Sequence, residues 1–159
     1  MKRIKQRIER GWDVLEIQAA GNFSEVDSMS IVWHGHYLRY CESAREAYSA
    51  ARGLSYQEME RVGSVAPVVR CQLEYLRPAR AGQLLTVRVA HIPQSQPSLG
   101  LFYEVLAPDG ALLCVCETVQ VFVDASGTPF LTPPPPVEAF FAAIQGREQA
   151  QGPARPAGE

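Results

Sequence analysis

The stretch Phe23-Ser-Glu-Val-Asp-Ser-Met-Ser-Ile-Val-Trp-His-Gly-His-Tyr-Leu-Arg-Tyr-Cys-Glu-Ser-Ala-Arg45 decides the fold of this chain. It begins with a short loop that carries one carboxylate, Asp27, and continues into an amphipathic helix predicted to open at His34 and Gly35. The first amides of a helix have no partner within the helix, so they can donate to an oxygen on which negative charge develops. A carboxylate close to such amides can act with them on a polarised carbonyl, and the stretch therefore predicts an active site.

The helix is predicted from residues that recur at a spacing of three and four and so share one face. That face is apolar and carries Tyr37, Tyr40, Cys41, Ala44, Ala47, Tyr48 and Ala51. The other side carries most of the charge: Arg39, Glu42, Arg45, Glu46 and Arg52. Gly53 is the residue type that commonly ends a helix. Because small side chains allow a sheet to approach closely, we expect this helix to lie at the centre of the fold.

The chain after Gly53 is expected to form one short helix and then strands. Ser55 and Glu58 make a capping pattern that predicts a short helix closing near Gly63. Alternating apolar residues then predict strands at about 69–75, 85–89, 99–106 and 112–123, and a further strand at about 12–20 precedes the loop with Asp27. Strand, long helix and four strands joined largely by hairpins predict an α+β fold, in which a curved antiparallel sheet of about five strands wraps on one long central helix.

The sequence is predicted to form one domain with a short C-terminal extension. The 159 residues, 47% of them apolar, supply one core, which we place in residues 1–132. Residues 133–145 are expected to form a spacer and a short terminal helix, because four consecutive prolines cannot continue a strand ladder. Residues 146–159 lack large apolar side chains and are expected to be a disordered tail.

Composition and charge argue against several classes of function. The formal charge of -2 and the absence of a long Lys/Arg run make nucleic acid an unexpected partner. The basic N-terminus is not followed by an apolar stretch, and the longest apolar run, Ala111 to Cys116, is too short to span a membrane. We therefore expect a cytoplasmic protein without a membrane span.

The four cysteines are interpreted as small buried hydrophobic residues. Cys41 lies on the apolar face of the long helix, and Cys114 and Cys116 share one face of a strand. A single Cys-x-Cys pair lacks the second pair of ligands that a structural zinc ion needs. The sequence therefore predicts neither a metal site nor a disulfide framework.

The order of these elements and the segment from Asp27 to Tyr40 resemble the hotdog-fold acyl-CoA thioesterases of the 4-hydroxybenzoyl-CoA thioesterase-like family, in particular the small bacterial Tol-Pal-associated type. In that family the loop reads, in general terms, Asp-x-x-x-x-Val-Tyr/Trp-His-x-x-Tyr, and the helix after it bears an aromatic residue, a Glu and an Ala-Arg pair. The matching positions here are Asp27, Val32, Trp33, His34, Tyr37, Glu42, Ala44 and Arg45. The resemblance covers about Trp12 to Asp124 and includes Tyr75-Leu-Arg-Pro-Ala-Arg80.

The resemblance implies hydrolysis of a thioester between an acyl or aroyl group and coenzyme A, which would be part of the substrate and not a retained cofactor. Asp27 would attack the thioester carbonyl as a nucleophile or activate water as a general base, and the sequence leaves both routes open. The helix-start amide of His34, and its ring, would face the thioester oxygen. Trp33 would line the acyl pocket, and Gly35 would allow the substrate to approach the backbone closely.

Several of these residues have alternative interpretations. Asp27 outside this motif would be interpreted as a helix cap or an Asx turn. Glu42 lies three residues before Arg45, a spacing typical of an ion pair, although another hotdog branch uses a carboxylate on the central helix for catalysis. Arg77 and Arg80 could bind the phosphates of coenzyme A or could be ordinary strand-end charges. Two further histidines are interpreted as exposed residues: His36 and His91.

Substrate range and partners also stay open at this point. Phe23 and Trp33 stand where many relatives have tyrosine, so the acyl group cannot be deduced from the motif. The alternatives to an acyl-CoA thioesterase are a thioesterase acting on acyl carrier protein, with Arg52, Arg77 and Arg80 as a basic rim, and a non-catalytic hotdog protein that binds acyl thioesters. The related hydratases pair Asp with a His five residues later, where this chain has Val32. Because sheet edges are commonly paired, we expect a homodimer or a tetramer.

Overall fold

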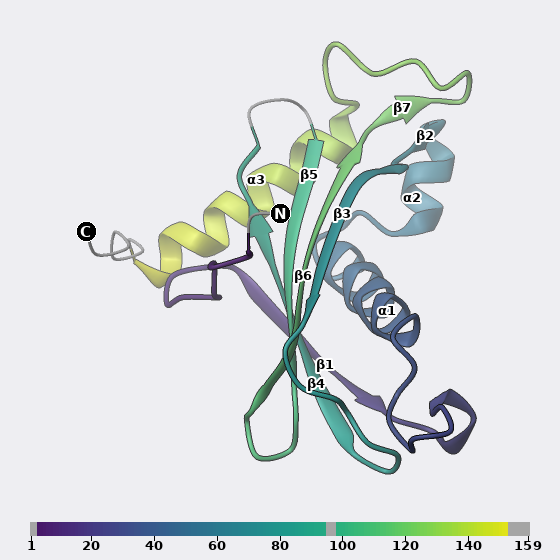
Figure 1. Ribbon diagram of the computed structural model, residues 1–159. Coiled ribbons are helices and arrows are strands. Elements are labelled where there is room, and N and C mark those ends of the chain that lie inside the picture. The colour runs from purple at the N-terminus through teal and green to yellow at the C-terminus, as the bar shows by residue number, and fades with distance from the viewer. Residues whose placement is uncertain (1–2, 95–97, 153–159) are drawn as a thin grey trace.

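The computed structural model describes residues 3–94 and 98–152, and in it one long helix lies across a five-stranded antiparallel sheet (Figure 1). The strands are β1 (Val14–Ala20), β2 (Ser64–Val65), β3 (Val68–Tyr75), β4 (Leu84–Ile92), β5 (Ser98–Leu106), β6 (Leu112–Val121) and β7 (Val123–Asp124). The helices are α1 (His36–Ala50), α2 (Tyr56–Arg61) and α3 (Pro135–Gln151), with a short 3-10 turn, η1 (Phe23–Glu25), before α1. The predicted α+β architecture is confirmed.

The strand order of the main sheet is β1-β4-β5-β6-β3, and each neighbouring pair is antiparallel. Hairpins join β4 to β5 and β5 to β6, as predicted. β3 is not joined to β4 by a hairpin: it pairs with β6 at the edge opposite β1, so the connection from β3 to β4 crosses the sheet. The short strands β2 and β7 form a separate pair beside the end of α2 (Figure 1).

The edge strand β3 is more exposed than its alternating sequence suggests. Val69 is 59% exposed and Val68 and Tyr75 are each 49% exposed. Alternation places residues on two faces, but it does not supply a neighbouring strand or a layer over the face. The alternation in this segment would suit a half-buried strand, but the first half of β3 is exposed on both faces, so β3 presents apolar side chains at an open edge.

The apolar face of α1 packs against the sheet. Tyr37, Tyr40, Cys41, Ala44 and Tyr48 are buried there, as predicted, together with alternate residues of β4 and β5. Leu99, Leu101, Tyr103 and Val105 of β5 belong to this core, which a strand in the middle of the sheet can fill from end to end. The helix thus lies over the concave side of the sheet and holds its own first turn at one end of it (Figure 1).

Arg52 does not lie on the charged side of the helix, as its sequence position suggested, but is 7% exposed. Its Nη2 donates to Asp13 Oδ1 at 2.6 Å, and its guanidinium group lies 3.5 Å from the centre of the Tyr48 ring. α1 ends at Ala50, so the helical periodicity used for the prediction does not extend to Arg52. A partner 39 residues away in the sequence decides the position of this side chain.

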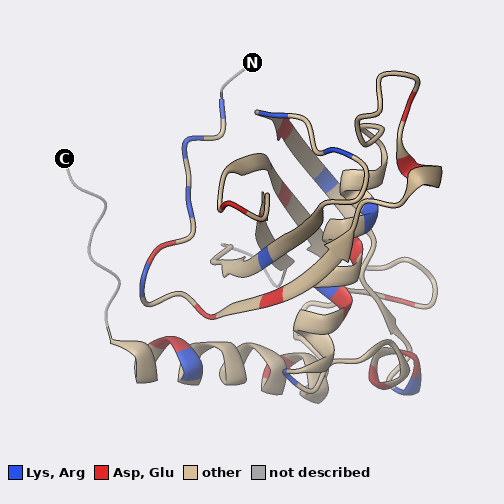
Figure 2. Cartoon of the chain, turned by 90° about the horizontal axis from the view of Figure 1, so that it is seen from below, with Lys and Arg blue, Asp and Glu red and all other residues tan. Residues whose placement is uncertain are grey.

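The opposite face of the sheet is covered by the segment before β1. Ile4 packs with Phe102 and Val115, and Ile8 and Trp12 lie against this cluster. The Ile8 amide donates to Glu104 Oε1 at 2.9 Å, which fixes the segment along the sheet. Figure 2 shows Lys and Arg residues at intervals along this segment.

The C-terminal helix α3 corrects two expectations. It begins at Pro135, inside the predicted spacer. Proline is tolerated in the first helical turn, because the backbone N–H groups of that turn have no partner within the helix. The helix continues to Gln151, past the predicted end at residue 145 and into the predicted tail. Val137, Phe140 and Ile144 are buried in the same core as α1, which is why the helix is held there. The remainder of the predicted tail, 153–159, lies outside the described residues.

Other sequence expectations concern membranes, metals and cysteines. Within residues 3–94 and 98–152, no helix is long and apolar enough to cross a membrane. The same part of the chain holds no group of at least three His, Cys, Asp or Glu side chains arranged to bind a metal ion. All four cysteines are free; Cys41, Cys114 and Cys116 are buried, as predicted, and Cys71 is exposed. Although Cys71 is exposed overall, partial burial of its thiol raises its pKa to about 11, so the thiol stays protonated.

Candidate active site

The loop between β1 and α1 carries Asp27, and backbone hydrogen bonds hold it in place. The Val32 amide donates to Ala79 O at 2.8 Å, and the Trp33 amide donates to Glu25 O at 2.8 Å. Within the loop, the Asp27 amide donates to Ile31 O at 2.9 Å. The loop is therefore pinned on both sides of Asp27.

The Asp27 carboxylate forms an Asx turn, and it can accept further hydrogen bonds. Its Oδ1 accepts a hydrogen bond from the Met29 amide at 2.8 Å. Asp27 is half-buried, and no Lys or Arg of the described residues forms an ion pair with it. The alternative interpretation as a turn residue is thus realised in the structure, but the carboxylate keeps lone pairs for another partner.

Asp27 faces a cavity of about 420 Å³ that combines three parts of the chain. The lining comes from the loop, the start of α1 and the chain after β3: Asp27, Met29, Ile31, Val32, His34, Tyr37, Tyr75, Leu76, Arg77 and Pro78. The two predicted catalytic residues, Asp27 and His34, therefore share one cavity. Arg77 joins them, whereas Arg80 is exposed and is not part of the lining.

The start of α1 lies at this cavity. The helix begins at His36 with Gly35 as its N-cap, slightly later than predicted, and the His36 amide donates to Trp33 O at 3.0 Å. Tyr37, in the first turn, lines the cavity. Partial positive charge at a helix start favours negative charge nearby, so the cavity combines a carboxylate with a helix end suited to an oxyanion.

Two tyrosines position this helix start, and the sequence did not identify their roles. The Tyr75 hydroxyl donates to His34 O at 2.8 Å, and the Tyr37 hydroxyl accepts from the Ala79 amide at 2.9 Å. The sequence places Tyr75 at the end of a predicted strand. The available signal was that Tyr75 opens the segment matching the family, but only the fold shows that the end of β3 meets the loop.

Tyr40 links α1 to the beginning of the loop through a hydrogen bond. Its hydroxyl donates to Glu25 Oε2 at 2.8 Å, and the same oxygen accepts from the Asn22 amide at 3.0 Å. Burial and the neighbouring carboxylate raise the pKa of Tyr40, so the hydroxyl stays protonated and remains a donor. This link crosses from the helix to the first residues of the loop that holds Asp27.

Trp33 and Gly35 lie beside the cavity but are not part of its lining. Trp33 is 49% exposed, and its indole covers Gly35 so closely that a Cβ on Gly35 would lie 2.1 Å from a ring atom. A larger residue at position 35 would therefore displace the Trp33 indole from its present position. The predicted roles of Trp33 in an acyl pocket and of Gly35 in substrate approach stay predictions.

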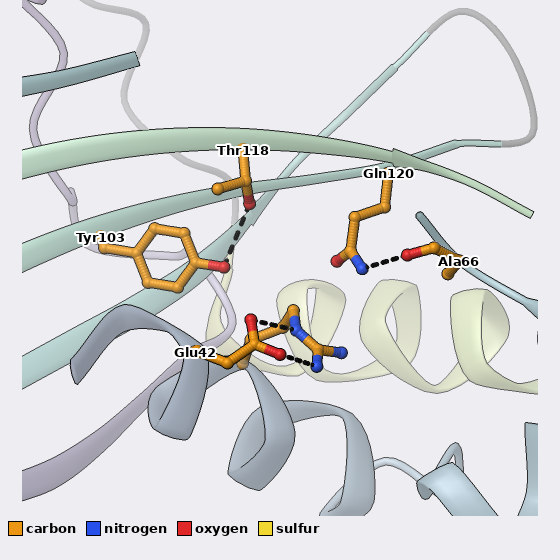
Figure 3. Close-up of polar contacts among 6 residues, drawn as sticks. Glu42, Ala66, Tyr103, Thr118 and Gln120 are labelled. Carbon is orange, nitrogen blue, oxygen red and sulfur yellow. Dashed lines mark hydrogen bonds and ion pairs between the residues drawn. The ribbon is translucent and has the colours of Figure 1, made fainter. Parts of the chain in front are cut away.

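Glu42 lies further along α1, outside the cavity of Asp27, and points toward the sheet (Figure 3). Arg45 Nε donates to Glu42 Oε2 at 3.0 Å and Arg45 Nη2 donates to Oε1, so the predicted ion pair is confirmed. These hydrogen bonds hold the pKa of Glu42 below its usual value. A carboxylate occupied in this way is a poorer base than Asp27.

The two other histidines are less exposed than predicted. His36 Nδ1 and His91 Nδ1 are buried and have no hydrogen-bond partner among the described residues. The His91 ring lies 5.9 Å from the Phe141 ring of α3, and burial lowers the pKa of His91. His91 is covered by α3 and by the segment before β1, and the His36 ring lies 5.6 Å from the Trp33 ring, so neither side chain is as open as its sequence position suggested.

Residues 22–144 match the model of the thioesterase-like superfamily. The chain belongs to this superfamily. It is 28% identical over 102 residues to the putative acyl-CoA thioesterase YneP of Bacillus subtilis, which covers 64% of this chain and 74% of that protein. It is 26% identical over 100 residues to the acyl-CoA thioesterase YbgC of Helicobacter pylori, with 63% and 73% covered.

Solved structures confirm the hotdog fold. A 1,4-dihydroxy-2-naphthoyl-CoA thioesterase from Synechocystis has a TM-score of 0.74 at 20% identity, covering 84% of this chain and 96% of that one. A Staphylococcus aureus protein in complex with CoA has a TM-score of 0.79 at 16% identity, covering 98% and 94%. A variant of 4-hydroxybenzoyl-CoA thioesterase, complexed with 4-hydroxybenzoyl-CoA, has a TM-score of 0.71 at 22% identity, covering 79% and 97%.

Proposed function

We propose that this superfamily member is a thioesterase that hydrolyses acyl- or aroyl-CoA to the free acid and CoA, with Asp27 as its catalytic carboxylate. The observation that carries the proposal is the shared cavity of Asp27, His34 and the first turn of α1. The names of the relatives, which include acyl-CoA thioesterases, support the same reaction. Coenzyme A is then part of the substrate, and no retained cofactor is required.

The thioester carbonyl would lie between Asp27 and the start of α1. In one route the carboxylate attacks the carbonyl carbon, and the C–S bond breaks as CoA leaves as the thiolate. Water then hydrolyses the mixed anhydride to the free acid and the regenerated carboxylate, and the proton released goes to the thiolate. In the other route the carboxylate takes a proton from water as water attacks the carbonyl carbon, and the tetrahedral intermediate then breaks its C–S bond while Asp27 returns the proton to the departing sulfur. In both, amides near His34 donate to the oxygen on which negative charge develops.

Tyr75 and Arg77 extend this arrangement. The hydrogen bond from Tyr75 to His34 O fixes the turn that presents the helix-start amides, so Tyr75 is a positioning residue. Arg77 lines the cavity and is exposed, which suits a guanidinium group that binds phosphate of coenzyme A. Arg52 is buried against Asp13 and cannot contribute to the basic rim considered for acyl carrier protein.

The exposed edge of β3 supports a homodimer. Val68 and Val69 leave apolar surface beside a strand whose outer hydrogen-bonding groups face no other strand in the described chain. Pairing with a second copy would cover this edge. Association into a tetramer, membership of the Tol-Pal-associated type and a cytoplasmic location belong to the same proposal. The Tol-Pal-associated type rests on the sequence motif, the tetramer on the expected pairing of sheet edges, and the location on the sequence expectation stated above.

A non-catalytic protein that binds acyl thioesters is the second candidate. The observation that favours it is the hydrogen bond from the Met29 amide to Asp27, because an Asx turn gives this carboxylate a structural role. The two candidates differ in whether Asp27 is needed for bond cleavage.

The test is thiol release from short, long and aromatic acyl-CoAs, and from acyl carrier protein thioesters, by the native protein and Asp27→Asn. We expect the variant to lose a factor of about 100 or more in kcat, the usual contribution of a positioned acid-base or nucleophilic carboxylate. Asparagine keeps the side-chain oxygen that accepts from the Met29 amide, so folding should persist.

Asp109→Asn is a matched control, because Asp109 also forms an Asx turn, accepting from the Ala111 amide at 2.9 Å, and lies away from the cavity. Its turnover should equal that of the native protein. Undiminished turnover in Asp27→Asn would refute the role of Asp27 and direct attention to Glu42. Acyl-CoA binding by both proteins without thiol release would favour the non-catalytic candidate.

A further inference from the structure

A second cavity, of about 630 Å³, lies along the later part of α1 and shares no residue with the cavity of Asp27. Apolar side chains form part of its wall, among them Leu54, Met59, Val65 and Val68. Polar side chains also line it, among them Glu42, Arg45 and Glu46 from α1, Ser64 from β2 and Gln120 from β6. The cavity is therefore amphipathic.

Gln120 presents an unpaired acceptor in this cavity. The residue is 3% exposed, and its Nε2 donates to Ala66 O at 2.6 Å (Figure 3). Because the Ala66 carbonyl can only accept, the amide nitrogen must face it and the amide oxygen must face the other way. Gln120 Oε1 is buried without a hydrogen-bond partner among the described residues. It requires a donor from a ligand or from water.

Ser64 adds a second unpaired group. It is 2% exposed and lines the same cavity, and its Oγ has no hydrogen-bond partner among the described residues. The Ser64 hydroxyl can donate or accept, whereas Gln120 Oε1 can only accept. The two side chains together therefore match a group that donates a hydrogen bond to Gln120 Oε1 and accepts one from Ser64 Oγ. A hydroxyl group meets both requirements.

The charges in the cavity, Glu42, Glu46 and Arg45, disfavour an anionic group. Arg45 is the cation of the lining, and it is already hydrogen-bonded twice to Glu42. Figure 3 shows Glu42 pointing from α1 toward the sheet while Gln120 points from β6 toward the helix. A carboxylate or phosphate would meet Gln120 Oε1 as a second acceptor and would compete with Glu42 for Arg45. An uncharged hydroxyl has neither disadvantage.

A further cavity, of about 400 Å³ and mostly apolar, lies along α1 between this region and the start of the helix. It shares Glu42, Arg45 and Val68 with the polar cavity, and Leu38 and Cys71 extend it in the other direction. Leu38 follows Tyr37 of the Asp27 cavity, and Cys71 precedes Tyr75 of that cavity by four residues on β3. From Tyr37 to Arg45 the rise along the helix is about 12 Å. The three cavities therefore follow one another along α1.

We infer that the polar cavity binds a hydroxyl group at the far end of the substrate's acyl chain, with Gln120 Oε1 accepting from that hydroxyl and Ser64 Oγ completing its hydrogen bonds. The inference rests on the proposed function, because it takes the thioester to lie beside Asp27. The apolar part of the chain then packs between Leu38 and Val68. The preferred substrate class is a medium- to long-chain acyl thioester that carries a hydroxyl remote from the carbonyl.

The test compares ω-hydroxyacyl-CoAs with unsubstituted acyl-CoAs of equal length, in a series from medium to long chains. At the length that reaches Gln120, we expect kcat/KM to favour the hydroxylated substrate by about tenfold or more, the value of one buried neutral hydrogen bond. Gln120→Leu and Ser64→Ala should each bring this ratio toward one. Ser43→Ala, an exposed serine on α1, is the control and should keep the ratio of the native protein.

A second measurement does not depend on catalysis. Calorimetric titration of the native protein and Asp27→Asn with ω-hydroxy and unsubstituted fatty acids of matched length should show tighter binding of the hydroxylated acid to both. If no thioester is cleaved but this binding preference is present and disappears in Gln120→Leu, the proposed function fails and the hydroxyl site stands. Equal rates and equal binding would overturn the site, since the cavity would then hold only water. A preference that persists in both cavity variants would overturn it too.

Discussion

Asp27 and Asp13 lie near opposite ends of α1, the first in the loop before the helix and the second against its last turn. Asp13 is 2% exposed, and its two oxygens accept hydrogen bonds from Arg52 and from the Tyr48 hydroxyl. Asp27 accepts one hydrogen bond from a backbone amide and faces a cavity. A buried carboxylate whose lone pairs are used holds elements together, whereas a carboxylate with free lone pairs at a cavity is available for chemistry.

The largest expected effect concerns Asp13. Asp13→Ala should lower the free energy of unfolding by about 3–5 kcal/mol, because it leaves the Arg52 guanidinium buried without its counter-ion. Urea denaturation measures this loss. The double variant Asp13→Leu/Arg52→Met should recover much of it, since an apolar pair needs no charge compensation. A loss below about 1 kcal/mol would show that Asp13 is no more structural than an exposed aspartate.

Asp27→Asn should give the opposite result in the same denaturation experiment. We expect its free energy of unfolding to change by no more than about 0.5 kcal/mol, because asparagine can keep the hydrogen bond from the Met29 amide. A large loss of stability would place Asp27 with Asp13 among structural carboxylates and would weaken the catalytic assignment. The contrast between the two aspartates therefore depends on measuring both variants for stability as well as turnover.

Tyr75→Phe should reduce kcat by about tenfold while leaving the fold intact, because it removes one hydrogen bond, to His34 O, that holds the helix start in position. Thiol-release kinetics measure the effect, and circular dichroism checks the fold. Tyr56→Phe is the matched control when both variants are measured with short acyl-CoAs, since Tyr56 is 78% exposed and lines only the second cavity, which a short chain does not reach. Equal kcat in the two variants would mean that the Tyr75 hydroxyl has no role in positioning.

The sequence predicted what depends on local pattern. The apolar face of α1 follows from residue spacing, and the start of α2 follows from Ser55, whose side chain accepts from the Glu58 amide at 3.2 Å. Asp27 and His34 were placed in one cavity because the loop and the helix adjoin in sequence. These predictions need no knowledge of how distant segments meet.

Features that depend on distant segments were missed. The burial of Arg52 requires Asp13, and the role of Tyr75 requires the end of β3 to meet the loop. The pairing of β3 with β6 instead of β4 decides which strand is exposed at the edge. A periodic pattern shows which residues share a face, but it does not show which face or charge lies opposite.

The smallest expected effect is a pH dependence at the Asp13 end of α1. Burial lowers the pKa of His91 from its usual 6.5, and the negative charge of Asp13 acts in the opposite direction. The unfolded chain then binds more protons than the folded protein between the lowered pKa and 6.5, so stability rises with pH through this window and falls as the medium becomes more acidic.

Titration of the His91 ring protons by NMR should give a pKa below 6.5, and a still lower value in Asp13→Asn, where the favourable charge is absent. His91→Gln should flatten the dependence of unfolding free energy on pH in the same window, because glutamine does not titrate. A His91 pKa at or above 6.5 would contradict the prediction, since it would mean that Asp13 outweighs burial. Asp13 would then act on a second group besides Arg52, which would distinguish it further from Asp27.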